Sequence, residues 1–127
     1  MQKQIKQVLE FHRLFNREIN VPNFNPLRGD LQVEEALELK QALSDKDMVE
    51  VADAVIDTLY IAIGTAIHFG FYDKLEELFD AVHKSNLSKL DPVTNKPTIR
   101  EDGKILKGPN FKAPTEDIKR ILKNETT

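Results

Sequence analysis

The feature that most limits how this chain folds is an apolar stretch, from about Val49 to Phe71, that carries acidic residues inside it. Glu50, Asp53 and Asp57 recur at spacings of three and four, so on an α-helix they form one acidic stripe. A helix that is apolar over most of its circumference is normally buried. Carboxylates on a buried helix cost several kcal/mol each unless a positive charge neutralises them.

A second acidic group precedes this stretch by one short polar break. Glu35 and Glu38 lie three residues apart and share a helical face with Glu34 close by, whereas Lys40 and Lys46 are the only cations near them in the sequence. Because two lysines cannot balance so many carboxylates, we expect a hard divalent cation with oxygen ligands, most plausibly Mg²⁺. A solvated glutamate-rich face is the alternative for this first group taken alone. Asp53 and Asp57 weigh against that alternative because aspartate is a poor residue in a helix interior.

Helical periodicity and capping residues divide the chain into helices joined by loops. We expect helices over residues 2–18, 30–43, from the Ser44–Asp47 cap to about Phe69, 72–87 and 116–123. Asp30 is the expected N-cap of the second helix, Ser44 and Asp47 form a capping box for the third, and Gly70 ends it. The proline-rich and glycine-rich residues 91–114 should be irregular, with a small hairpin at Asp102-Gly103. The fold class that follows is all-α: an antiparallel four-helix bundle with an irregular basic C-terminal tail.

Length and charge narrow the range of functions. A chain of 127 residues suits one domain, over residues 1–127, and the absence of cysteine excludes disulfides and thiolate metal sites. Residues 1–83 hold 8 basic and 15 acidic residues, whereas residues 84–127 hold 10 and 6, so an acidic body precedes a basic tail. This balance argues against nucleic-acid binding by the whole fold. The polar Met1–Lys6 start and the interrupted apolar run predict a cytoplasmic protein with no signal peptide and no membrane span.

The ordered set of motifs resembles the all-α nucleoside triphosphate pyrophosphohydrolases, which include MazG-like proteins and the phosphoribosyl-ATP pyrophosphohydrolases of histidine synthesis. Their Glu-Glu-x-x-Glu motif followed by Glu-x-x-Asp corresponds to Glu34-Glu35-Ala36-Leu37-Glu38 and Glu50-Val51-Ala52-Asp53. The resemblance extends over most of the chain, through Phe11-His12, Asp57-Thr58-Leu59-Tyr60, His83-Lys84-Ser85-Asn86 and the Asp102–Gly108 segment. In these segments the chain is similar to small phosphoribosyl-ATP-pyrophosphohydrolase-like proteins of bacteria and phages.

The resemblance implies a role for each group of residues. It implies a Mg²⁺ site, for which Mn²⁺ is a possible substitute, at Glu35, Glu38, Glu50 and Asp53. Glu34, Glu35 and Glu38 would be catalytic, with Glu34 outside the ligand set or orienting the attacking water. Candidate contacts to the nucleotide substrate are His12, Lys84, Asn86, Lys89, Lys104 and Lys107; a core role for His12 and solvated lysines are the alternatives. Family members also assemble as homodimers or tetramers, which agrees with the apolar third helix.

The implied reaction is cleavage between the α and β phosphates of a nucleoside triphosphate, giving the monophosphate and pyrophosphate in a house-cleaning role. Metal ions would clamp the phosphate oxygens and activate water, and lysines would neutralise the leaving pyrophosphate. Alternatives are the histidine-pathway enzyme itself, a non-catalytic nucleotide-binding helical module, and a di-iron carboxylate bundle. The last would need two Glu-x-x-His motifs, and only Asp80-x-x-His83 comes close. Base and sugar preference stay open.

Overall fold

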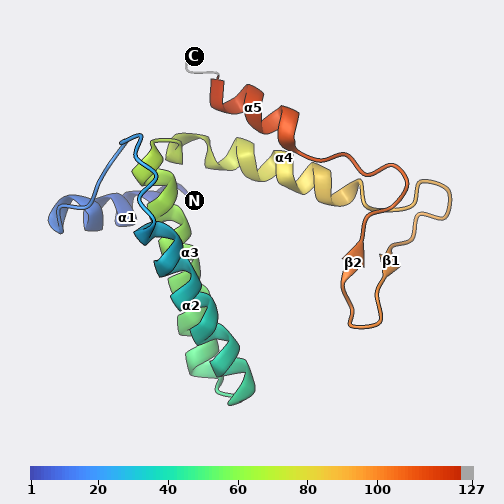
Figure 1. Cartoon of the computed structure of the whole chain (residues 1–127), viewed down its shortest axis with the longest axis horizontal. Coiled ribbons are helices and arrows are strands. Elements are labelled where there is room, and N and C mark those ends of the chain that lie inside the picture. Colours follow the sequence, from blue (N-terminus) through green and yellow to red (C-terminus); the bar gives the residue numbers. More distant parts are fainter. Residues whose placement is uncertain (124–127) are drawn as a thin grey trace. The chain divides into compact units, whose positions relative to one another are not determined.

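The computed structural model describes residues 1–123 and is mostly helical, which confirms the all-α fold class (Figure 1). Its elements are α1 (Gln2–Leu14), α2 (Leu27–Ser44), α3 (Met48–Phe69), the 3₁₀ turn η1 (Tyr72–Lys74), α4 (Leu75–Leu87), β1 (Thr98–Ile99), β2 (Ile105–Leu106) and α5 (Thr115–Lys123). The chain divides into a first unit, Met1–Asp73, and a second unit that begins at Lys74. A single domain over residues 1–127 stays a prediction.

An antiparallel hairpin of α2 and α3 is the main element of the first unit (Figure 1). Helix α2 begins at Leu27, three residues before the predicted start, so the prediction of Asp30 as N-cap is wrong. The reason is local: Asn25 Oδ1 accepts a hydrogen bond from the Leu27 N–H at 3.0 Å, which lets the helix begin directly after Pro26. Only Asp45, Lys46 and Asp47 separate α2 from α3, so the two helices must pack side by side.

Both ends of α3 follow from single residues. Asp47 is the N-cap, because its carboxylate accepts from the Glu50 N–H at 3.2 Å, whereas Ser44 belongs to the last turn of α2. The predicted capping box, with Ser44 as the cap and Asp47 as its acid, is therefore wrong. Gly70 ends the helix in the left-handed conformation with φ of +82°, as predicted. A left-handed residue also follows α1, where Asn16 has φ of +53°, so this helix ends at Leu14 and not at residue 18.

The core of the first unit lies between α1 and the C-terminal half of α3. Ile5, Val8 and Leu9 of α1 are buried together with Ile63 and Ile67 of α3, and the two helices are in contact. By length and composition α3 could cross a membrane. It is in contact with both α1 and α2.

A half-buried arginine joins α2 to this core. Arg28 of α2 donates to the carbonyl oxygen of Ile61 at 2.7 Å and to Thr65 Oγ1 at 3.1 Å, so its guanidinium is fixed against α3. Gly64 lies directly beneath it. A Cβ atom at Gly64 would stand 2.5 Å from Arg28 Nη2 and 3.1 Å from His12 Nε2. The close approach of α1, α2 and α3 at this point therefore depends on a residue without a side chain.

The second unit pairs α4 with α5 and carries the small hairpin. Strands β1 and β2 are antiparallel, with Ile99 opposite Ile105, and Gly103 in their turn has φ of +93°, which confirms the expected Asp-Gly hairpin. Ser85 of α4 is buried and donates to the carbonyl oxygen of Lys112 at 2.7 Å, which ties the segment before α5 to α4. Lys107 lies over the Phe111 ring, 4.9 Å from its centroid.

Replacing Gly64 with alanine should destabilise the protein, because the new methyl group meets side chains that are held by hydrogen bonds and burial. We expect Gly64→Ala to lower the free energy of unfolding by about 1–3 kcal/mol, measured by urea denaturation. The matched control is Gly29→Ala in α2, where a Cβ would meet nothing within 4 Å. That variant should be as stable as the wild type or gain about 0.5 kcal/mol. Equal stabilities for the two variants would contradict this packing.

Candidate metal centre

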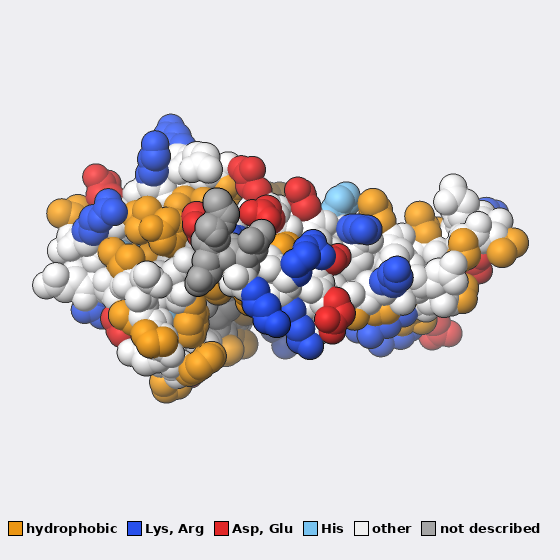
Figure 2. Space-filling view, turned by 90° about the horizontal axis from the view of Figure 1, so that it is seen from above, with side chains coloured by type: hydrophobic (Ala, Val, Ile, Leu, Met, Phe, Trp, Pro, Cys, Tyr) orange, Lys and Arg blue, Asp and Glu red, His pale blue; other side chains and the backbone are white. Residues whose placement is uncertain are grey.

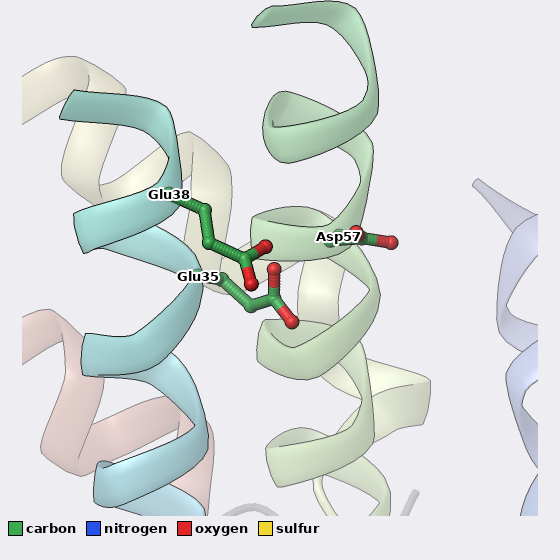
Figure 3. Close-up of side chains that lie close together, drawn as sticks. All are labelled: Glu35, Glu38 and Asp57. Carbon is green, nitrogen blue, oxygen red and sulfur yellow. The ribbon is translucent and has the colours of Figure 1, made fainter. Parts of the chain in front are cut away.

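The α2–α3 hairpin brings three carboxylates together. Ligand oxygens of Glu35 and Glu38, from α2, and Asp57, from α3, all lie within 4.8 Å of one another (Figure 3). Figure 3 shows the two glutamates directed from α2 toward α3, with their carboxylates side by side, while Asp57 projects from α3 on the side away from α2. Glu35 and Asp57 are half-buried and Glu38 is exposed. The group is therefore open enough to admit a ligand.

The electrostatics of this group favour a bound positive charge. Glu35 Oε2 is buried and has no hydrogen-bond partner. Burial first, and then the interaction with Glu38 and the charges of Asp57 and Glu34, raise the pKa of Glu35 from 4.5 to about 7. Burial also raises the pKa of Asp57, with further contributions from Asp53 and Glu38. None of the ion pairs within residues 1–123 involves any of these carboxylates.

The donor set fits a hard dication. Three carboxylates provide only oxygen ligands, which is the preference of Mg²⁺ and of Mn²⁺, and leave room for water in the remaining positions. A cation would give the unpartnered Glu35 oxygen a partner and offset the charges of Glu38, Asp57 and Glu34, which add to the effect of burial on the pKa of Glu35. Neutral side chains at these three positions would not require a nearby positive charge. The acidic cluster is thus suited to hold a metal ion, although which metal it holds stays a prediction.

The structure places the other predicted acidic residues around this group. Glu34 precedes Glu35 on α2 and is exposed. Glu50 and Asp53 are exposed in the N-terminal half of α3 and lie outside the three-carboxylate cluster, although Asp53 is near enough to Asp57 to raise its pKa. Their roles as metal ligands stay predictions. Asp57 was not assigned as a ligand from the sequence, although its spacing of four residues from Asp53 already placed it on the same stripe.

The predicted substrate contacts are distributed between the two units. His12 is buried in the first unit, 3% exposed, with its Nδ1 2.9 Å from the Glu18 carbonyl oxygen. Burial, opposed by that hydrogen bond and aided by the charge of Arg28, lowers the pKa of His12, so the ring stays neutral as part of the core. A substrate contact by His12 stays a prediction. So do those of the exposed or half-buried residues of the second unit, which are Lys84, Asn86, Lys89, Lys104 and Lys107.

The raised pKa of Glu35 predicts how stability varies with pH when no divalent cation is present. Because the folded protein holds the Glu35 proton more tightly than the unfolded chain does, stability should be greatest below pH 4.5 for this group and fall as the pH rises to about 7. Urea denaturation in EDTA between pH 5 and 8 measures this. Glu35→Gln, which cannot ionise, should remove that part of the pH dependence and be more stable than the wild type at pH 8. A slope unchanged by the substitution would contradict the assignment.

Comparison with known proteins identifies the family to which the chain belongs. A family model described as phosphoribosyl-ATP pyrophosphohydrolase matches residues 8–86, which is more than half of the chain. The match includes the whole α2–α3 hairpin with its three clustered carboxylates. No curated protein sequence matches the chain. The family is part of the MazG-like superfamily, its enzymes cleave acid anhydrides, and they are typically metal-dependent. The chain therefore belongs to the phosphoribosyl-ATP pyrophosphohydrolase family.

Proposed function

We propose that this protein hydrolyses a nucleoside triphosphate, standard or modified, to the monophosphate and pyrophosphate. The observation that carries the proposal is the cluster of Glu35, Glu38 and Asp57, in which a buried carboxylate oxygen has no partner. Structural carboxylates are normally paired or solvated, and an arrangement that leaves like charges together is typical of a binding site. The dication that accompanies a triphosphate can compensate this charge and link the carboxylates to the phosphates.

The acidic residues fall into two groups in this proposal, those that bind the metal ion and one that orients the attacking water. Glu35, Glu38 and Asp57 bind Mg²⁺, with Asp53 and Glu50 on the same stripe of α3 available for further contacts. Mg²⁺ supplies charge neutralisation at the phosphate oxygens when bound. Glu34, exposed beside the cluster, accepts a hydrogen bond from the attacking water and orients it. No serine, cysteine or histidine nucleophile is required for such a direct attack by water.

The family match supports a second candidate substrate. The family is named for phosphoribosyl-ATP, a substrate that also contains a triphosphate. Both substrates use the same acidic cluster and differ in what surrounds the base. Growth of a histidine auxotroph that lacks this step, when supplied with the present gene, would support phosphoribosyl-ATP as the substrate. Cleavage of free nucleotides without complementation would support the house-cleaning role.

Release of pyrophosphate from a panel of nucleoside triphosphates tests the activity. Wild-type protein should release pyrophosphate in Mg²⁺ and none in EDTA. Glu38→Gln and Asp57→Asn should each lower kcat by about 100-fold or more, because each removes a charge that holds the cation. Asp45→Asn, an exposed residue of the α2–α3 connection, is the control and should retain wild-type activity. A protein that binds nucleotides but cleaves none would be a non-catalytic binding module, contrary to the proposal.

We also propose that the protein is a homo-oligomer, a dimer or a tetramer. Apolar side chains on α2 and α3 are exposed in the single chain, among them Leu37 at 60% and Val55 at 47%. Figure 2 shows hydrophobic side chains gathered on the surface of the first unit. Monomeric proteins rarely expose large contiguous apolar patches, and a second copy of the hairpin is a complementary cover.

Analytical ultracentrifugation tests the assembly. The wild type should sediment as a dimer or larger species at micromolar concentration. Leu37→Lys together with Val55→Lys should shift it to the monomer, because each places a charge on the apolar surface. Val93→Lys is the matched control, since Val93 is 91% exposed in a loop of the second unit, and it should leave the assembly intact. A wild-type protein that stays monomeric at high concentration would refute the proposal.

A further inference from the structure

A cavity between α1 and α3 shares helix α3 with the acidic cluster, and neither the family match nor the sequence motifs assign a role to it. Its volume is about 410 Å³, which is within the range of small-ligand sites. Val8 of α1 with Ile56 and Leu59 of α3 provide apolar walls. Gln4, Gln7 and Glu10 of α1 and Tyr60 of α3 provide polar groups. Apolar walls with a few polar groups suit a flat heterocycle with polar edges.

The position of the cavity relative to Asp57 follows from α3. Ile56 is the residue before Asp57, and Tyr60 lies three residues after it, one turn along the same helical face. Figure 3 shows Asp57 directed away from α2, and the cavity lies on the α1 side of α3. A ligand whose phosphates reach the acidic cluster can therefore extend its other end into this cavity within the first unit.

The polar groups of the cavity give it a chemical preference. A carboxylate accepts hydrogen bonds and cannot donate them at neutral pH, whereas the amides of Gln4 and Gln7 do both. None of the ion pairs within residues 1–123 involves Glu10. Burial first, and then the charge of Glu10, raise the pKa of Tyr60, so its hydroxyl stays protonated and available as a donor. The Tyr60 ring also meets Phe11 edge-to-face at 5.7 Å, which limits its movement.

Resting on the proposed nucleotide hydrolysis, we infer that the α1–α3 cavity is the base subsite and that Glu10 selects bases with an exocyclic amino group. Adenine and cytosine present an amino group, which donates to a carboxylate. Hypoxanthine and uracil present a carbonyl oxygen at the same place, which a carboxylate repels. The faces of the base lie against Ile56, Leu59 and the Tyr60 ring, and such stacking is tolerant of base type. Glu10 is thus the residue that discriminates, and the stacking side chains supply affinity.

Matched nucleotide pairs test this inference in the full-length protein. Isothermal titration calorimetry in Mg²⁺ would measure binding of the α,β-methylene analogues of ATP and ITP, which are not cleaved. Pyrophosphate release would give kcat/KM for dCTP and dUTP. The wild type should favour the amino member of each pair by about tenfold, which is what one charged hydrogen bond contributes at a partly solvated site. Glu10→Gln should reduce this preference to about twofold or less, because an amide donates to a carbonyl as readily as it accepts from an amine.

The control variant is Glu76→Gln, which removes the same charge from an exposed position on α4, and it should retain the tenfold preference. Equal binding of both members of each pair by the wild type, or an equal loss for both members in Glu10→Gln, would overturn the inference. Dissociation of an oligomer by Glu10→Gln without a change in base preference would also overturn the inference, because that result would mean that a second copy covers the cavity. Cleavage of nucleotides with an unchanged preference refutes the base subsite alone, whereas no pyrophosphate from any nucleotide refutes the proposed function as well.

Discussion

Repulsion among carboxylates on the two packed helices α2 and α3 is the constraint on which the rest of the site depends. Apolar packing and a three-residue connection force the helices side by side, and this holds Glu35, Glu38 and Asp57 within 4.8 Å of one another. Burial then raises the pKa of Glu35 to about 7. The packing energy of the hairpin therefore holds like charges together that would otherwise separate. A site in this state gains stability from any cation that it binds.

The sequence predicted those features of the fold that depend on local chemistry. Gly70 as a helix end and the Asp-Gly hairpin each follow from one or two residues whose preferences do not depend on the rest of the chain. The start of α2 was predicted three residues late, because Asp30 is a favourable N-cap residue by type, whereas the hydrogen bond from the Leu27 N–H to Asn25 Oδ1 is evident only in the structure. The helices were predictable, whereas the division into two units was not, since that depends on contacts between distant segments.

The sequence predicted which types of residue form the candidate site better than it predicted how they are arranged in space. Helical spacing placed Glu35 and Glu38 on one face, but which residues of α3 meet them depends on the rotation of that helix about its axis. The clustered partner is Asp57, one turn beyond Asp53. His12 lies in the core beside Gly64 and Arg28, which is the alternative role that the sequence left open for it, and its contact with substrate stays a prediction. No sequence motif includes the polar residues of the cavity, which are Gln4, Gln7 and Glu10. They are identified only from the packing of α1 on α3.

The three clustered carboxylates predict a specific order of metal affinities, and direct titration of Mg²⁺ into the nucleotide-free protein by calorimetry measures it. Near pH 8, where Glu35 is ionised, the wild type should bind Mg²⁺, and Asp57→Asn should weaken binding by about 10- to 100-fold. Asp45→Asn, on the connection between the helices, should bind as the wild type does. Wild-type affinity in Asp57→Asn, or no Mg²⁺ binding by the wild type, would contradict the view that these carboxylates are held together to bind a dication.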